Sequence, residues 1–342
     1  MTTAEITEEL RALLEAELNG IVSSRDMPLY GMMSYHMGWT DSGGGPVSKT
    51  IGDRAHGLLC LLACHAAGGD IATALPAAAA VELVENFCRI HDDVQAGNPR
   101  RDNRDSVWWV WGPAQAINAG DGMHALARLA LFRLTQAGVP PTVTVRALRL
   151  LDEASLRTCE GRFLDLEAQE KIDLGIEAYK DMAHQKTGSL FSCSMSLGAL
   201  IATHDEDDNS DLLEAMATCG ANLGVALQMH QDLLQLWGDG DGDVPDASPD
   251  AMNKKKLLPV VYAFDKASVG EKRRMGEIFF KRVLEPDDVA KLRGIIEGLG
   301  VREECGEMVN RYRSRALEVL ESVSLSSDGK KQIQQFADDL LK

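Results

Sequence analysis

The chain has 342 residues, of which 45% are hydrophobic, so it can bury a sizeable core and is neither disordered nor fibrous in composition. Acidic residues outnumber basic ones by 52 to 35, and the resulting net charge of −17 disfavours binding to nucleic acid or to anionic lipid. No apolar run reaches the roughly 18 residues that cross a bilayer, and the amino terminus does not resemble a signal peptide. We therefore expect a cytoplasmic protein without stable membrane insertion and without a nucleic acid partner.

Apolar residues recur three and four positions apart through most of the chain, a spacing typical of helices that bury one face. Strand patterns are nearly absent. Glycine, proline and aspartate mark the expected loops, and the last of these, Gly238–Pro249, is predicted to be a mobile lid. No linker or repeat divides the chain, so we predict a single all-α domain over residues 1–342. The predicted helices cover residues 5–22, 57–68, 76–91, 106–135, 143–157, 189–203 and 211–237, and the other predicted loops are Asp41–Val47, Pro140-Pro141 and Asp205–Asp211.

Two aspartates, Asp92 and Asp93, end an apolar helix, and two arginines, Arg100 and Arg101, follow within a few residues. Hard carboxylate oxygens beside bidentate anion binders suit a diphosphate that is bridged by Mg²⁺. An acidic helix end that is merely solvated is the alternative. A further aspartate, Asp232, lies on another apolar helix, where a lone carboxylate needs a partner or a cation.

Several separate blocks of the chain carry recognisable motifs of polar residues. These blocks are, in order, His91-Asp92-Asp93 with Arg100-Arg101, then Trp111–Asp121, Cys159–Leu166, Met182–Gly188 and Lys254–Tyr262. Together they resemble the trans-isoprenyl diphosphate synthases of the polyprenyl synthetase family. The resemblance implies an isoprenoid synthase-type fold, which is an all-α helical bundle around a deep apolar cavity, and an enzyme that forms a homodimer.

The same resemblance implies Mg²⁺ as the cofactor and an allylic prenyl diphosphate as the substrate, with the diphosphate held at the mouth of the cavity. It also implies roles for individual side chains. The expected Mg²⁺ ligands are Asp92, Asp93 and Asp232, the expected diphosphate-binding residues are Arg100, Arg101, Lys186 and Lys255, and the expected catalytic residues are Asp92, Asp93 and Lys186.

Two residues that precede the aspartates are candidates for setting the length of the substrate chain. Phe87 and Cys88 lie five and four residues before Asp92, so on a helix both project about one turn deeper than the carboxylates. By the resemblance, bulk at this depth limits chain length, and a phenylalanine predicts a shortened pocket for a C15 to C20 chain. Ordinary core packing is the alternative for both residues.

The two aspartate-rich motifs depart from the family pattern D-D-x-x-D. The first motif ends in Ala96 instead of a third aspartate, and the second keeps only Asp232, between Gln231 and Gln235. Amide oxygens can bind Mg²⁺, but without charge they bind it less tightly. The sequence therefore predicts a weakened metal site.

The motif that binds homoallylic isopentenyl diphosphate in this family, G-K-R-x-R-P, departs even further. Here Asp53 replaces the lysine and His56 replaces the second arginine, so a negative charge opposes the anion that the motif would bind. Elsewhere, Arg162 replaces the usual glutamine after Glu160-Gly161.

Loss of the homoallylic motif beside retained allylic binders leads to three hypotheses. The leading one is a Mg²⁺-dependent terpene cyclase, which ionises one prenyl diphosphate and lets an internal double bond or water capture the cation. The alternative is a prenyltransferase, a polyprenyl diphosphate synthase that either elongates chains or transfers the prenyl group to another acceptor. The third hypothesis is a non-catalytic subunit that pairs with an active synthase.

Overall fold

The computed structural model describes residues 3–47, 52–171, 174–204, 210–238 and 248–342. These residues form two compact units, each assembled from three segments of the chain. Unit 1 comprises Met1–Glu153, Cys193–Ala217 and Leu320–Asp338, and unit 2 comprises Ala154–Ser192, Thr218–Val319 and Asp339–Lys342. The predicted lid at residues 238–249 and the predicted acidic loop at 205–211 lie largely outside the described residues.

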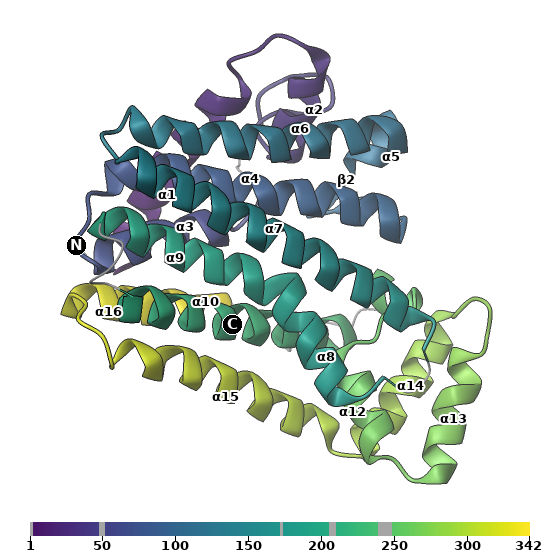
Figure 1. Cartoon of the computed structure of the whole chain (residues 1–342). Helices are drawn as coiled ribbons and strands as arrows, with labels where there is room; N and C mark the ends of the chain where they lie inside the picture. The colour runs from purple at the N-terminus through teal and green to yellow at the C-terminus, as the bar shows by residue number, and fades with distance from the viewer. Residues whose placement is uncertain (1–2, 48–51, 172–173, 205–209, 239–247) are drawn as a thin grey trace. The chain divides into compact units, whose positions relative to one another are not determined.

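Helices make up nearly all the regular structure that is described, which confirms the predicted all-α class (Figure 1). Among the described elements, five helices contribute residues to both units, namely α7, α9, α10, α15 and α16. The helices that begin in unit 1 are α1 (Thr3–Val22), α2 (Pro28–His36), α3 (Ala55–Ala66), α4 (Ile71–Ala96), α5 (Val107–Trp111), α6 (Pro113–Phe132), η1 (Arg133–Thr135), α7 (Pro141–Gln169), α10 (Ser210–Trp237) and α16 (Ser327–Leu340). Those that begin in unit 2 are α8 (Ile176–Ala183), η2 (His184–Gly188), α9 (Ser189–Thr203), α11 (Pro249–Met252), α12 (Leu258–Lys266), α13 (Val269–Phe279), α14 (Pro286–Gly298) and α15 (Val301–Leu320).

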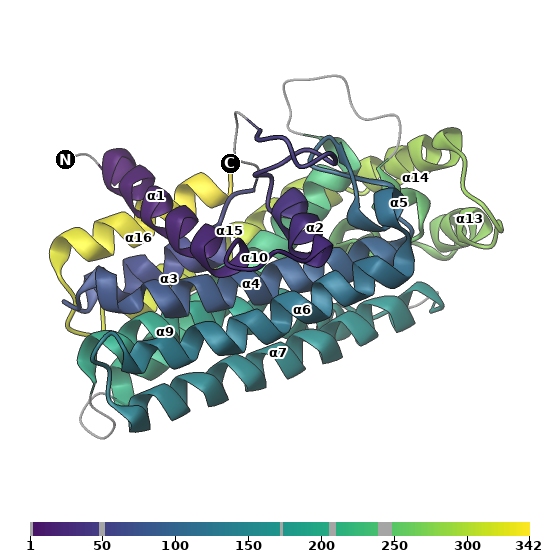
Figure 2. The ribbon, with the colours of Figure 1, turned by 90° about the horizontal axis from the view of Figure 1, so that it is seen from above.

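Unit 1 is organised around α4, which packs against α1, α3 and α6 (Figure 2). The alanine run Ala77–Ala80 is fully buried, and its small side chains let neighbouring helices approach α4 closely. Gly57 on α3 serves the same purpose, because an added Cβ there would lie 3.0 Å from the carbonyl oxygen of Ala78. α4 begins where the Asp70 side chain accepts a hydrogen bond from the amide of Ala72, and it ends at Gly97 in the left-handed conformation.

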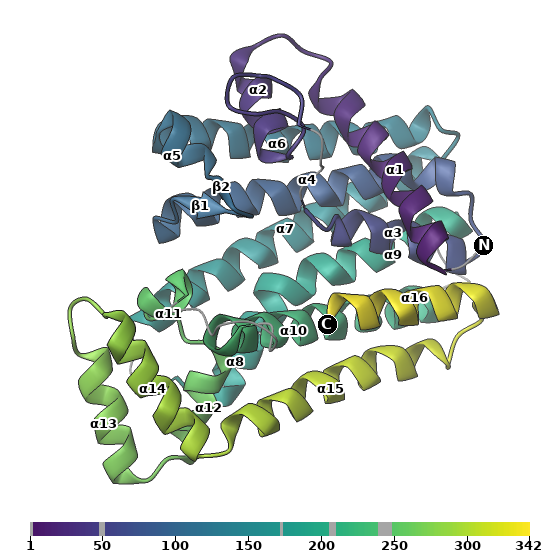
Figure 3. The same cartoon turned by 180° about the vertical axis from the view of Figure 1, so that it is seen from behind.

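Unit 2 has its own hydrophobic core between α8, the second part of α10, and helices α12 to α15. Figure 3 shows α13 and α14 side by side at one end of this unit. The apolar stripes of these helices meet in one cluster, so the unit buries a continuous interior. Its fully buried members include Tyr179, Ala226, Met229, Leu258, Met275, Val289, Ile296, Val301 and Cys305.

Two local features differ from the predicted elements. The expected helix over residues 106–135 is broken at Gly112, whose φ of +84° ends α5, and Pro113 then begins α6. The chain also forms a short antiparallel hairpin of β1 (Arg100–Arg101) and β2 (Arg104–Asp105), where no strand was expected. Strands of two residues are too short to produce an alternating pattern in the sequence.

Within the described residues one helix, α4, is long and apolar enough to cross a membrane by length and composition alone. Of its most apolar stretch, 67% is buried inside the protein, as is usual for a core helix. Length and composition therefore do not distinguish α4 from an ordinary core helix.

Candidate active site

A tight turn after α4 positions the arginine pair of unit 1. Asp102 and Asn103 have φ values of +50° and +61°, and two consecutive left-handed residues form the hairpin turn that suits the twist of paired strands. Aspartate and asparagine tolerate this conformation better than most residues. In the hairpin, Arg100 lies opposite Asp105 and Arg101 lies opposite Arg104. The turn thus directs Arg101 back toward the end of α4.

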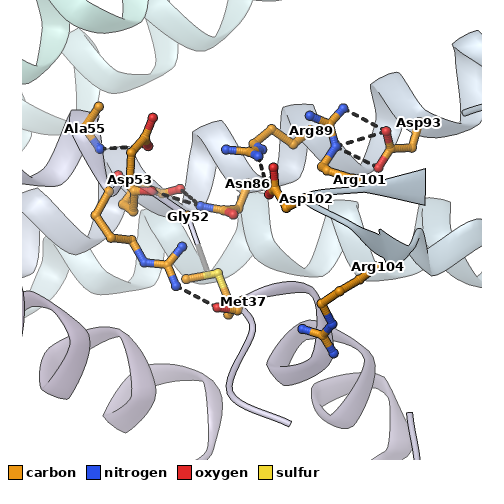
Figure 4. A network of polar contacts seen from close by, with 12 residues as sticks. Met37, Gly52, Asp53, Ala55, Asn86, Arg89, Asp93, Arg101, Asp102 and Arg104 are labelled. Carbon is orange, nitrogen blue, oxygen red and sulfur yellow. Dashed lines mark hydrogen bonds and ion pairs between the residues drawn. The ribbon is translucent and has the colours of Figure 1, made fainter. Parts of the chain in front are cut away.

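Asp93 and Arg101 bind each other (Figure 4). The guanidinium donates through Nε to Oδ1 at 3.0 Å and to Oδ2 at 2.9 Å, and through Nη2 to Oδ1 at 2.7 Å. The Asp93 side chain is only 3% exposed, and this burial raises the pKa of its carboxyl although Arg101 opposes the shift. In the described structure the Asp93 carboxylate is therefore engaged by Arg101, while Asp92 is half-buried at the same helix end.

Further arginines give this part of unit 1 a positive field. Arg89 pairs with Asp102 at 2.7 Å (Figure 4). Arg104 donates to the carbonyl oxygens of Tyr35 at 3.0 Å and Thr40 at 2.7 Å. Burial, together with the positive charges of Arg89, Arg101 and Arg54, holds the pKa of His36 well below its usual value. His36 is consequently neutral at pH 7 and adds no charge to this field.

The segment Gly52–Gly57 carries two charged side chains, Arg54 and Asp53, which differ in their surroundings. Arg54 is 3% exposed at its side chain and is used internally, because it donates to Glu15 at 2.6 Å and to the carbonyl oxygen of Met37 at 2.7 Å. Asp53 is exposed, and its carboxylate accepts a hydrogen bond of 3.2 Å from the amide of Ala55 at the start of α3. His56 is 6% exposed. The segment therefore presents an exposed carboxylate and a buried, neutralised arginine.

The two residues predicted to limit chain length lie one turn before the aspartates, as expected from helical geometry. Cys88 is 1% exposed and belongs to the core. The half-buried Phe87 ring packs edge-on against His91, with ring centroids 4.7 Å apart, and lies 5.2 Å from the ring of His124 on α6. Their role in chain length stays a prediction.

In unit 2, Lys186 forms an ion pair of 2.7 Å with Asp165. Gly161 makes this pairing possible, because a Cβ at that position would lie 2.2 Å from the backbone nitrogen of Lys186. The backbones of α7 and the π-helix η2 thus touch at the glycine. Burial would raise the pKa of the Asp165 carboxyl, but the charges of Lys186 and Lys255 outweigh burial and lower it.

The three consecutive lysines Lys254, Lys255 and Lys256 differ in their surroundings. Lys255 is half-buried and pairs with Asp250 at 2.9 Å. Lys256 is 4% exposed and lies 4.5 Å above the ring of Phe279, and burial lowers its pKa to about 8. Lys254 donates to the carbonyl oxygen of Lys281. The half-buried Lys255 is also the lysine of this run whose charge acts on Asp165, the partner of Lys186.

Asp232 is buried in the interior of unit 2, and both of its carboxylate oxygens are engaged. Oδ2 accepts hydrogen bonds from the Tyr179 hydroxyl at 2.6 Å and from the backbone amide of Leu258 at 2.8 Å. Oδ1 accepts from Nε2 of Gln228 at 2.9 Å, and Gln228 in turn accepts from the Thr187 hydroxyl at 2.8 Å. In this arrangement Asp232 joins α8, α10 and α12, and its role as a Mg²⁺ ligand stays a prediction.

The predicted site residues thus fall into two groups, one in each unit. Asp92, Asp93, Arg100 and Arg101 belong to unit 1, and Lys186, Lys255 and Asp232 belong to unit 2. Among the residues that the structure describes, no three histidine, cysteine, aspartate or glutamate side chains gather as a metal site. Mg²⁺ is often held by one or two carboxylates together with substrate phosphates, so Asp92 at the end of α4 fits this mode of binding.

Sequence reasoning missed the residues that neutralise the predicted binders. Asp165 pairs with Lys186 and Asp250 pairs with Lys255 in unit 2. In unit 1, Asp102 pairs with Arg89, which was not among the predicted binders. The Asp102-Asn103 dipeptide was a detectable turn signal, because these residue types favour left-handed backbone. The other two pairs join residues whose side chains only the folded backbone brings together.

Comparisons with known proteins agree with the described fold. The family model for polyprenyl synthetase matches residues 46–296. The chain is 32% identical to the geranylgeranyl diphosphate synthase of Mycobacterium tuberculosis over 305 residues, which are 88% of this chain and 85% of that protein. It is 28% identical to the (2E,6E)-farnesyl diphosphate synthase of the same organism over 328 residues, with 95% and 89% covered.

A solved structure extends this similarity to the whole chain. The polyprenyl synthetase from Streptomyces coelicolor superposes with a TM-score of 0.89 at 30% sequence identity, and the match covers 100% of both chains. The described helices therefore have the fold of that structure, and the chain belongs to the polyprenyl synthetase family.

Proposed function

We propose that the protein is a prenyltransferase of the polyprenyl diphosphate synthase type, which binds an allylic prenyl diphosphate and transfers its prenyl group to an acceptor. The observation that carries the proposal is the match to the polyprenyl synthetase family over residues 46–296, with relatives that are named geranylgeranyl and farnesyl diphosphate synthases. This observation favours prenyl transfer over the cyclisation that the departures from the motifs suggested.

The chemistry requires that charge be neutralised on a leaving group. When the bond between the allylic carbon and the diphosphate oxygen breaks, both electrons leave with the diphosphate. Arg100 in unit 1 is 68% exposed at its side chain, and Lys186 and Lys255 in unit 2 are partly accessible, so each unit has cations that could bind diphosphate oxygens. Bound Mg²⁺, held by Asp92, would withdraw further charge from the leaving diphosphate.

A terpene cyclase remains the second candidate function, because one specific observation favours it. Asp53 presents a carboxylate where the family binds a second diphosphate, and the neighbouring Arg54 is buried in an ion pair with Glu15. A protein that does not bind isopentenyl diphosphate cannot elongate a chain with it. Such a protein would use an internal double bond or water to capture the allylic cation.

One experiment separates these functions. The purified protein is incubated with Mg²⁺ and C10, C15 or C20 allylic diphosphates, with and without isopentenyl diphosphate, and products are identified by mass spectrometry alongside released diphosphate. We expect longer prenyl diphosphates that form only with both substrates. Hydrocarbon or alcohol from a single substrate would establish the cyclase, and absence of any turnover would favour the partner-subunit hypothesis.

Two finer features belong to the same proposal. The Phe87 ring supports a C15 to C20 substrate, because it occupies space one turn below Asp92. A homodimer is supported by large apolar side chains that unit 1 leaves exposed on α5, α6 and the first part of α7. These side chains are Trp109, Ile117, Leu129, Phe132 and Val145, and light scattering on the eluting protein would give the oligomeric state directly.

A further inference from the structure

The hairpin that follows α4 carries three arginines with different surroundings. Arg100 and Arg101 form β1, and Arg104 begins β2 opposite Arg101. Arg101 binds Asp93 near the end of α4, whereas the Arg100 side chain is 68% exposed. Figure 4 shows Arg101 extending toward Asp93 and Arg104 extending away from it. Strands of two residues are too short to be stable by themselves, so contacts with the rest of unit 1 must hold this hairpin in place.

Arg104 connects the hairpin to α2 and to the loop that follows α2. Its guanidinium donates to the carbonyl oxygen of Tyr35 at 3.0 Å and to that of Thr40 at 2.7 Å. The guanidinium carbon also lies 4.1 Å from the centre of the Tyr35 ring, a distance that suits a cation–π contact. In return, the Tyr35 hydroxyl donates to the carbonyl oxygen of Asp105 on β2 at 2.7 Å. Arg104 and Tyr35 thus link α2 and β2 in both directions.

The surroundings of Tyr35 stabilise this link. Tyr35 is 7% exposed, and burial raises its pKa, so its hydroxyl keeps the proton that it donates. The ring of Trp111 packs edge-on against the Tyr35 ring, with centroids 5.0 Å apart. The partner that Arg104 binds on α2 is therefore itself held in position.

The two ends of the hairpin are joined independently of Arg104. The carbonyl oxygen of Asn98 accepts hydrogen bonds from the Ser106 hydroxyl at 2.8 Å and from the indole nitrogen of Trp108 at 2.7 Å. These bonds close the base of the hairpin. Its orientation depends on the two outward attachments, which are Arg101 at α4 and Arg104 at α2.

Arg104 and Arg100 differ in the donors that they have left for a ligand. Both terminal nitrogens of Arg104 donate to carbonyl oxygens of the protein, so this side chain is not placed to bind a ligand. Arg100 donates through Nη2 to the carbonyl oxygen of Asn103 at 3.0 Å, and it lies 3.8 Å from the Asp105 carboxylate. An exposed ion pair of this length contributes little. Arg100 is therefore the arginine of the hairpin that can turn toward phosphate oxygens.

We propose that Arg104, together with Tyr35, is a positioning residue that holds the hairpin against α2 and so places Arg100 for binding the diphosphate of the substrate. The inference rests on the proposed function, which supplies a prenyl diphosphate as the ligand. It assigns a role to a side chain that does not contact this ligand and that lies outside the motifs recognised in the sequence.

The test measures binding of farnesyl thiolodiphosphate, which resists cleavage, to the full-length protein by calorimetry in the presence of Mg²⁺. Arg104→Ala should weaken binding about tenfold or more, because a displaced hairpin moves the Arg100 donors away from the phosphate oxygens. Arg104→Lys should weaken it less, since an ammonium can still donate to a carbonyl oxygen. Tyr35→Phe removes no charge and should weaken binding about threefold through loss of the bond to Asp105.

A double variant separates positioning from a general loss of structure. If Arg104 acts through Arg100, then Arg104→Ala should cause little further loss of affinity in a protein that already carries Arg100→Ala. Arg133→Ala is the matched control, because Arg133 loses an ion pair of 2.7 Å with Glu17 elsewhere in unit 1 and should bind the analogue as the wild type does.

The outcomes are distinct from those of the activity assay. If Arg104→Ala or Tyr35→Phe binds the analogue as tightly as the wild type does, or if the losses from Arg100→Ala and Arg104→Ala add, the inference is overturned even where prenyl transfer is observed. A wild type that does not bind the analogue overturns it as well. If binding follows the expected order without any prenyl transfer, the proposed function fails and the positioning role stands. Circular dichroism shows whether each variant is folded, and Arg104→Lys and Tyr35→Phe carry the test if Arg104→Ala is not.

Discussion

The Tyr179 hydroxyl donates a hydrogen bond of 2.6 Å to Asp232 in the interior of unit 2. Tyr179 has no exposed surface, and Asp232 is 5% exposed. Burial raises the pKa of the Asp232 carboxyl to about 6, although hydrogen bonds from Tyr179 and the Leu258 amide oppose the shift. A carboxylate that the family associates with metal binding is thus part of the core, and this placement has a measurable consequence.

The stability of the protein should depend on pH through Asp232. The pKa of Asp232 is higher in the folded protein than in the unfolded chain, so the unfolded chain releases this proton first as pH rises. The free energy of unfolding therefore falls between about pH 4 and about pH 6. Relative to Asp232→Asn, which cannot titrate, the wild type should lose up to about 3 kcal/mol of unfolding free energy over this range. Urea unfolding at several pH values measures it, and parallel curves for the two proteins would contradict it.

Asp92 and Asp93 should separate into a functional and a structural residue. Asp93→Asn leaves the Arg101 guanidinium without its bidentate partner, so we expect a loss of roughly 3 kcal/mol in stability. Asp92→Asn should cost less stability and abolish diphosphate release. Chemical unfolding and a diphosphate assay on both variants decide the matter, and equal stability losses would refute the division of roles.

The contact between α7 and η2 should tolerate no side chain at Gly161. In Gly161→Ala the new Cβ would lie 2.2 Å from a backbone nitrogen, so the helices must separate, and we expect a loss of at least about 3 kcal/mol. Gly294→Ala on α14 is the control, because nothing lies within 4 Å of its Cβ and the change should stabilise the helix by up to about 1 kcal/mol. Thermal unfolding of both variants provides the comparison.

Truncating Phe87 should lengthen the products. Phe87→Ala removes a ring that packs against His91 and His124, and the space one turn below the aspartates becomes available to a longer chain. We expect the product distribution, measured by mass spectrometry, to shift by at least one C5 unit. Cys88→Ala is a useful comparison, because Cys88 is fully buried and should affect product length less. An unchanged distribution would assign Phe87 to ordinary packing.

Restoring charge at Asp53 tests how this chain treats isopentenyl diphosphate. Asp53→Lys replaces an exposed carboxylate with an ammonium, so a nearby diphosphate should bind more tightly, and we expect the KM for isopentenyl diphosphate to fall at least fivefold. The lost hydrogen bond to Ala55 should cost about 1 kcal/mol of stability. An unchanged KM would mean that residue 53 does not face the second substrate.

Helical periodicity predicted the fold class well, because apolar residues three and four positions apart can be recognised in the sequence itself. The expected helix over 189–203 coincides with α9, and that over 211–237 nearly coincides with α10. The break at Gly112 was missed because the apolar pattern continues across it, although the Gly112-Pro113 pair carried the signal.

The contacts among the candidate site residues could not be predicted, and the roles of these residues stay predictions. Asp93 and Arg101 were both expected to face the ligand, but the hairpin turn brings them into contact with each other. Asp165 and Lys186 are 21 residues apart, and only the close packing at Gly161 joins them. Such pairs depend on tertiary geometry, which a single sequence does not display.

The hydrogen bonds of Asp232 distinguish this residue from the two glutamines of the second aspartate-rich motif. Asp232 is required by the core, because it holds the first turn of α12 and the Tyr179 hydroxyl. Gln231 is exposed and Gln235 is half-buried, so neither position is constrained in the same way. Substitutions at these two positions can therefore change the chemistry of the motif without disturbing the fold, and both residues could be replaced by aspartate on the same grounds.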